Sequence, residues 1–172
     1  MKPKQNKQET PSWHEYFMGM AKYAATKSKD RSTKVGAVLV SDNNRVLGIG
    51  FNGFPRGVND NVEVRHDRPL KYLITEHAER NCIYSAACHG VKTGGTKIYI
   101  SGNGLPCADC ARAIIQSGVT EVITFMGKFE GKGSQWEESI KASEMMLQEA
   151  GIKLTLLDKN FEVAAIRWRA KR

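Results

Sequence analysis

Two segments decide how this chain folds and what it can bind: Thr75-Glu76-His77-Ala78-Glu79 and Leu105-Pro106-Cys107-Ala108-Asp109-Cys110. The first segment offers an imidazole and, two residues later, a carboxylate, while the second offers two thiols three residues apart. Imidazole nitrogen and thiolate sulfur are ligands that zinc prefers, usually in a tetrahedron of four. The two segments therefore predict a zinc site made by His77, Cys107 and Cys110.

The number of ligands indicates what kind of zinc site this is. Three protein ligands leave one tetrahedral position open for water, as in catalytic zinc sites, and no fourth Cys or His stands at ligand spacing. Pro106 suits the first turn of a helix, which would place both thiols on one helix face. Glu79 is then expected to carry protons rather than to bind the metal. A redox pair and a structural zinc site are the alternatives.

The composition is that of one ordinary globular domain. The chain has 172 residues, of which 41% are hydrophobic and 26% are charged, and this is enough for a sizeable core. No apolar run is long enough to cross a bilayer, and the polar start lacks the apolar core of a signal peptide. Four cysteines, two of them assigned to metal, indicate reduced thiols and a cytoplasmic protein, in the host cytoplasm if the source is viral.

The net charge of +8 invites comparison with nucleic-acid-binding proteins. Most of this excess lies in the terminal segments 1–10 and 159–172, whereas the rest of the chain is only mildly basic. Such a body suits a small anionic substrate at least as well as a polynucleotide. We therefore expect a small-molecule partner, with no membrane and no nucleic acid involved.

Hydrophobic periodicity predicts that helices alternate with strands. Ser12 and Glu15 form a capping-box pattern at the start of an amphipathic segment. We expect helices over 12–27, 71–89, 106–118 and 136–150, a hairpin over 35–50, and strands over 96–100, 121–125 and 152–157. Because the later strands alternate with helices, they should run parallel. This predicts an α/β protein with three α/β/α layers and a five-stranded mixed sheet with an N-terminal hairpin.

The segments outside the predicted helices and strands give the boundaries of the domain and a long loop. Residues 1–11 are predicted to be a disordered basic N-terminus, 12–158 the domain, and 159–172 a basic tail that could form a short helix over 160–170. The loop 51–70 is long enough to indicate a function, with a surface loop over the hairpin edge as the alternative.

Another loop, 126–135, follows the end of a strand, where open α/β sheets bind ligands. Phosphate contacts from Lys128 or Lys132 are therefore a hypothesis. Trp136 is expected to pack the last helix, and stacking near a substrate is the alternative.

Several motifs occur together in this chain. They are Val35-Gly36-Ala37, Gly48-Ile49-Gly50-Phe51-Asn52-Gly53, His77-Ala78-Glu79, Pro106 to Cys110, Ile114 to Val119, and Glu121-Val122-Ile123. His-x-Glu with Pro-Cys-x-x-Cys is the signature of zinc deaminases. Over residues 12–157 the chain resembles the deoxycytidylate (dCMP) deaminases of the cytidine deaminase superfamily, particularly those of phages and bacteria. The Gly-Phe-Asn-Gly stretch points to the deoxycytidylate branch.

The resemblance implies a cytidine deaminase-like fold and hydrolysis of dCMP to dUMP and ammonia, which supplies thymidylate synthesis. Glu79 would be the catalytic residue, and Zn²⁺ would be held by His77, Cys107 and Cys110. The resemblance also implies a homohexamer that dCTP activates and that dTTP inhibits together with Mg²⁺.

By position, the resemblance implies that Asn52 contacts the deoxyribose and that Ser32 and Lys34 lie near the 5′-phosphate. A solvated surface lysine is the alternative for Lys34. A regulatory nucleotide site is implied after the hairpin, and its residues are Phe51, Asn52, Gly53, Arg56, Asn59 and Asp60. The segment 61–75, the loop 126–135 and the basic tail depart from the family pattern.

Three other functions fit part of the sequence. A deaminase of tRNA or single-stranded DNA would use the basic tails, and its affinity would fall steeply with salt. A deaminase of free bases or nucleosides would share both metal motifs. A catalytically silent zinc protein with an interaction role would not need Glu79.

Overall fold

The structure is a computed structural model that describes residues 10–127 and 134–158. The predicted disordered N-terminus, except Thr10 and Pro11, and the predicted tail helix lie outside the described residues. The proposed phosphate contacts of Lys128 and Lys132 lie outside them as well.

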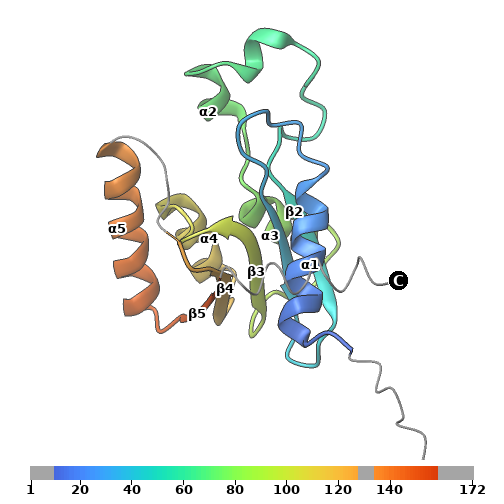
Figure 1. Cartoon of the computed structure of the whole chain (residues 1–172), viewed down its shortest axis with the longest axis vertical. Coiled ribbons are helices and arrows are strands. Elements are labelled where there is room, and N and C mark those ends of the chain that lie inside the picture. Colours follow the sequence, from blue (N-terminus) through green and yellow to red (C-terminus); the bar gives the residue numbers. More distant parts are fainter. Residues whose placement is uncertain (1–9, 128–133, 159–172) are drawn as a thin grey trace, which may run out of the picture.

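A five-stranded sheet forms the middle layer of the molecule (Figure 1). Its strand order is β2 (Val46–Phe51), β1 (Gly36–Val40), β3 (Lys97–Asn103), β4 (Glu121–Phe125) and β5 (Lys153–Leu157). β1 is antiparallel to both β2 and β3, whereas β3, β4 and β5 are parallel. The predicted mixed sheet with its N-terminal hairpin is confirmed.

Helices cover both faces of this sheet (Figure 1). They are α1 (Trp13–Ala25) on one face and α3 (Ala78–Cys88), α4 (Ala108–Gln116) and α5 (Ser134–Glu149) on the other. The core under α1 includes Phe17 and Ile123, and the core under the other helices includes Cys82 and Ile114. The three-layer α/β/α architecture is therefore confirmed. Within the described residues, no helix is long and apolar enough to span a membrane.

The first helix begins where its capping box predicts. The Glu15 backbone N–H donates to the Ser12 hydroxyl at 3.2 Å, and the Ser12 N–H donates to the Glu15 carboxylate at 2.7 Å. Two backbone donors that the helix itself cannot satisfy are thus paired. The buried Phe17 and Ala21 then face the sheet.

The single helix expected over 71–89 is wrong. The chain instead forms α2 (Leu70–Ile74), leaves the helical conformation at Thr75, and begins α3 after His77. Between the two helices, Glu76 makes a two-hydrogen-bond bridge with Gly53, at 2.8 and 3.0 Å. A long-range backbone pairing has overridden the local helical pattern. The long loop also contains a 3₁₀ helix, η1 (Glu63–His66).

Close packing of α3 on β2 requires glycine at position 50. A Cβ atom there would lie 2.4 Å from both the Ala78 carbonyl oxygen and the Cys82 backbone nitrogen. Because these are backbone atoms of a packed helix, a methyl group must push α3 away from the sheet. We expect Gly50→Ala to lower the free energy of unfolding by about 1–3 kcal/mol and to weaken metal binding at His77.

Thermal denaturation and zinc content test this prediction. Gly19 in α1 is the matched control, since a Cβ atom there would meet nothing within 4 Å. Gly19→Ala should raise stability by about 0.5–1 kcal/mol, because alanine is the better helix former. An unchanged thermal unfolding midpoint for Gly50→Ala would contradict this prediction, because it would show that α3 can shift away from β2 without loss of stability.

Candidate active site

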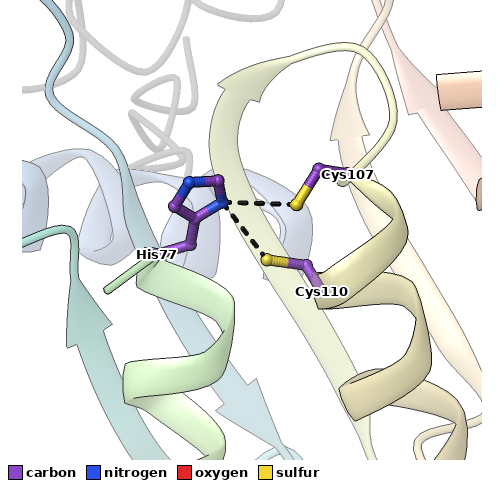
Figure 2. Close-up of side chains that lie close together, drawn as sticks. All are labelled: His77, Cys107 and Cys110. Atoms are coloured by element: carbon purple, nitrogen blue, oxygen red, sulfur yellow. Dashed lines mark hydrogen bonds between the residues drawn. The ribbon is translucent and has the colours of Figure 1, made fainter. Parts of the chain in front are cut away.

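The side chains of His77, Cys107 and Cys110 converge at the N-terminal ends of two helices (Figure 2). The His77 Nδ1 atom lies 3.4 Å from the sulfur of each cysteine, and the three ligand atoms are all within 4.8 Å of one another. Tetrahedral zinc with bonds of about 2.0–2.3 Å requires donor atoms roughly 3.5 Å apart. One nitrogen and two sulfurs at these distances therefore fit zinc.

The local backbone explains why the two thiols face the same way. Cys107 is the N-cap of α4, with an extended backbone, and Cys110 lies in the first turn of that helix. Pro106 was expected inside the first turn, but it lies one residue before the N-cap. The spacing of three residues still places both sulfurs on one side. The structure therefore brings together all three predicted metal ligands.

Hydrogen bonds within this cluster favour a thiolate. The pKa of Cys107 is lowered to about 4, chiefly by its hydrogen bond with Cys110 and then by His77. The same contact with Cys107 raises the pKa of His77 to about 9. A cluster that already stabilises negative charge on sulfur is suited to a divalent cation.

Glu79 lies in the first turn of α3, two residues after His77, with only 6% of its surface exposed. Burial raises the pKa of its carboxyl group, and the nearby His77 offsets part of this rise. A buried carboxyl with a raised pKa is suited to take up and release a proton near neutral pH. The break before α3 makes this possible, because His77 precedes the helix and both side chains can reach the same pocket.

The match to known proteins agrees with this geometry. Residues 11–126 match the model of the cytidine and deoxycytidylate deaminase zinc-binding region. The chain belongs to this deaminase family. The expected enzyme class is confirmed, and the cluster is the candidate zinc site of this deaminase.

This deaminase matches individual relatives over most of its length. It is 39% identical over 145 residues to an uncharacterized deaminase of Aliivibrio fischeri, covering 84% of this chain and 93% of that one. It is 34% identical over 145 residues to the human deoxycytidylate deaminase, covering 81% and 76%. The dCMP deaminase of cyanophage S-TIM5, solved with dCMP and dUMP, has a TM-score of 0.67 at 25% identity, covering 87% and 99%. The expected cytidine deaminase-like fold is confirmed.

A series of charged side chains links the two segments that carry the proposed metal ligands. The Glu76 carboxylate accepts the His77 backbone N–H at 3.0 Å and lies 2.5 Å from Nε of Arg80. Arg80 in turn approaches Asp109, between the two thiols in sequence, at 4.0 Å. These contacts tie the start of α3 to the start of α4. None of these three residues was predicted from the sequence to belong to the site, although the spacing of Glu76 and Arg80 is that of a helical ion pair.

The predicted substrate residues lie around the entry to β1. The buried Asn52 accepts the Val35 N–H at 2.8 Å and donates to the Thr33 carbonyl at 2.9 Å, so it fixes the backbone of this segment. The Ser32 hydroxyl accepts from the Lys71 amine at 2.5 Å. Lys34 is exposed. The structure thus places Asn52 as an anchor of the segment that carries Ser32 and Lys34.

A buried ion pair lies beside Ser32. The Lys71 amine is 2.8 Å from the Asp30 carboxylate, and their side chains are only 12% and 6% exposed. Asp30 also accepts the backbone N–H groups of Ser32 and Thr33. Burial opposes the charged form, but these contacts together hold the pKa of Asp30 below its usual value. Asp30 and Lys71 therefore fix the predicted phosphate-side segment, and neither was singled out from the sequence.

Four of the six predicted regulatory residues line one cavity of about 350 Å³. They are Phe51, Gly53, Arg56 and Asp60. Asn52 and Asn59 are not part of the lining; the Asn59 side chain instead accepts the Asn61 N–H at 3.0 Å. The lining also includes the charged groups Lys27, Lys29, Asp30, Arg31 and Lys71, and the imidazole of His66. The excess of basic groups suits a ligand that carries phosphate.

Proposed function

We propose that this deaminase converts dCMP and water into dUMP and ammonia. The observation that carries the proposal is the pairing of a three-ligand His77, Cys107 and Cys110 cluster with a buried Glu79. The similarity to deoxycytidylate deaminases over four fifths of the chain supports dCMP as the substrate.

The chemistry divides between the metal and Glu79. Zinc, when bound by the three ligands, supplies an activated water molecule as the nucleophile for C4 of the base. Glu79 carries two protons in turn: it accepts one from the water and delivers it to N3, and it then takes the second from the new hydroxyl group on C4 and delivers it to the amine as the C4–N bond breaks, which releases ammonia. Burial raises the pKa of Glu79, so its carboxyl group holds a proton more readily than an exposed glutamate and can serve as donor as well as acceptor. Its burial keeps bulk water from competing for those protons.

The nucleotide would be held by the segment before β1. Ser32 and Lys34 are proposed to lie near the 5′-phosphate, and Asn52 near the deoxyribose. Lys34 is exposed, so its amine is accessible to a phosphate group. The hydrogen bonds of Asn52 to Thr33 and Val35 support a position at the edge of the sugar site.

We also propose that dCTP activates the enzyme and that dTTP inhibits it with Mg²⁺, through the cavity lined by Phe51, Gly53, Arg56 and Asp60. Asn52 and Asn59 would support this loop from outside the cavity. The basic lining favours triphosphate, and the Asp60 carboxylate offers an oxygen ligand of the kind Mg²⁺ prefers. A homohexamer and a cytoplasmic location complete the proposal. Reduced zinc-binding thiols support that location.

Ammonia release from dCMP, cytidine and a single-stranded oligonucleotide, each with and without dCTP, tests this function. We expect turnover of dCMP alone, raised by dCTP. Equal turnover of cytidine would show that the phosphate is not recognised. Turnover of the oligonucleotide alone, with affinity that falls steeply as salt rises, would replace the proposal with a polynucleotide deaminase.

A further inference from the structure

Trp136, at the start of α5, lies beside the metal ligands rather than only within the helix packing expected from the sequence. Its ring is inclined by 18° to the His77 imidazole, with 6.3 Å between ring centroids. The ring of Tyr72 in α2 contacts the same indole edge-on, with 6.1 Å between the ring centroids and an angle of 71° between the ring planes. Aromatic rings from three separate elements therefore gather at the zinc-ligand cluster.

The end of α5 that carries Trp136 is held in place independently of these rings. The Ser139 hydroxyl, about one turn further along the helix, accepts the Ala108 backbone N–H at 3.0 Å. Ala108 stands between the two thiol ligands in sequence and begins α4. The start of α5 is therefore tied to the segment that carries both sulfurs, so the indole has a fixed position relative to the metal site.

The two aromatic rings next to His77 keep surface that a further planar group can contact. Trp136 is half-buried, and Tyr72 remains 47% exposed although it contacts Trp136. The aromatic cluster therefore contacts His77 on one side and keeps surface accessible to solvent on the other.

We propose that Trp136, supported edge-on by Tyr72, is the surface against which the pyrimidine ring of the substrate stacks when C4 is presented to the metal. This inference rests on the proposed function, because it specifies how that site holds its base. Stacking on an aromatic side chain tolerates any planar base. Trp136 would therefore position the ring, while other groups select cytosine.

Binding of dUMP, the proposed product, tests the inference without turnover. Titration of the zinc-loaded full chain with dUMP should quench indole fluorescence in the wild type and in Trp13→Phe, but not in Trp136→Phe. Trp13 is the matched control, because it stacks on Phe17 of α1 on the opposite face of the sheet. The wild-type signal would then be assigned to Trp136.

Trp136→Leu should raise the Kd for dUMP and the KM for dCMP at least about tenfold, since alanine substitutions at stacking sites have effects of this order. Trp136→Phe should restore most of the affinity, and the zinc content of both variants should equal that of the wild type. Tyr72→Leu changes an exposed side chain and should raise both constants several-fold. This variant keeps the test decisive if Trp136→Leu fails to fold.

The outcomes separate this inference from the proposed function. Turnover of dCMP together with unchanged dUMP affinity in Trp136→Leu would overturn the role of Trp136 alone. Loss of zinc in both Trp136 variants would also overturn it, because the ring would then serve only to hold His77. Quenching through Trp136 without turnover of dCMP would support the stacking surface and reject the proposed reaction. No binding of dUMP to the wild type would overturn both.

Discussion

Glu79→Gln should reduce deamination by about 10²–10⁴-fold or more while zinc stays bound, because the amide keeps the shape of the side chain but cannot carry a proton. The side chain is buried, so a variant of equal size disturbs the packing least. Ammonia release under saturating substrate gives kcat, and zinc per chain is measured on the same sample. Normal turnover in this variant would remove Glu79 from the mechanism.

Stability provides an internal control for this variant. Burial raises the pKa of Glu79, so the folded state pays to ionise the carboxyl group at pH values above its unfolded pKa. The neutral amide avoids that penalty, and Glu79→Gln should unfold at the same temperature as the wild type or higher. Loss of activity together with a lower midpoint would indicate misfolding instead.

Asp109→Asn is the matched control for removing an acidic group near the metal. Asp109 lies between the two thiols in sequence, but its side chain is 53% exposed, pairs with Arg112 at the surface, and approaches Arg80 only at 4.0 Å. The proposed mechanism gives it no proton to carry. Its kcat should therefore remain within a few-fold of the wild type, since exposed ion pairs contribute little.

The clustering of the three proposed metal ligands could be predicted from the sequence because its determinants are local. The imidazole and the carboxylate are two residues apart, the thiols are three residues apart, and each pair begins a helix. The spacing alone thus fixes the relative directions of the side chains. The layers of the fold were predictable for a similar reason, since strands and helices alternate with clear apolar patterns.

The break before α3 depends on contacts that the local pattern does not contain. Residues 71–89 read as one helix, yet Glu76 pairs with the backbone of Gly53 and His77 becomes the N-cap of α3. Asn81 secures the same junction by donating to the Phe51 carbonyl at 2.9 Å. Such pairings join residues more than twenty positions apart. Hydrophobic periodicity is evaluated within one short window of sequence, so it carries no information about such long-range pairings.

The surroundings of the metal ligands were hidden for the same reason. Trp136 and Ser139 reach the site only because α5 packs on α4, and Asp30 meets Lys71 only because the loop before β1 folds against α2. Within its own segment, each of these residues looks like an ordinary helix or loop residue. Their place at the site is a property of the tertiary structure.

Cys107→Ala should remove both zinc and activity. Only His77 and Cys110 would remain, and two ligands leave the cation without the second thiolate that neutralises its charge. We expect zinc to fall from about one ion per chain to nearly none after dialysis. A variant that stays loaded would exclude Cys107 as a ligand.

Two other cysteines of the deaminase separate metal loss from general damage. Cys82 is buried in the core under α3, and burial raises its pKa to about 12, so it stays a neutral thiol. Cys82→Ala should lose stability, because it leaves a cavity, and yet keep its zinc. Cys88 is exposed at the end of α3, and Cys88→Ser should change neither property.

A chelator completes this test, because metal that binds only the folded state contributes to its stability. Stripping zinc should lower the unfolding temperature of the wild type, Cys82→Ala and Cys88→Ser by similar amounts. It should leave Cys107→Ala unchanged, since that variant has no metal to lose. A chelator-induced shift in Cys107→Ala as large as that of the wild type would mean that the stabilising ion is bound elsewhere.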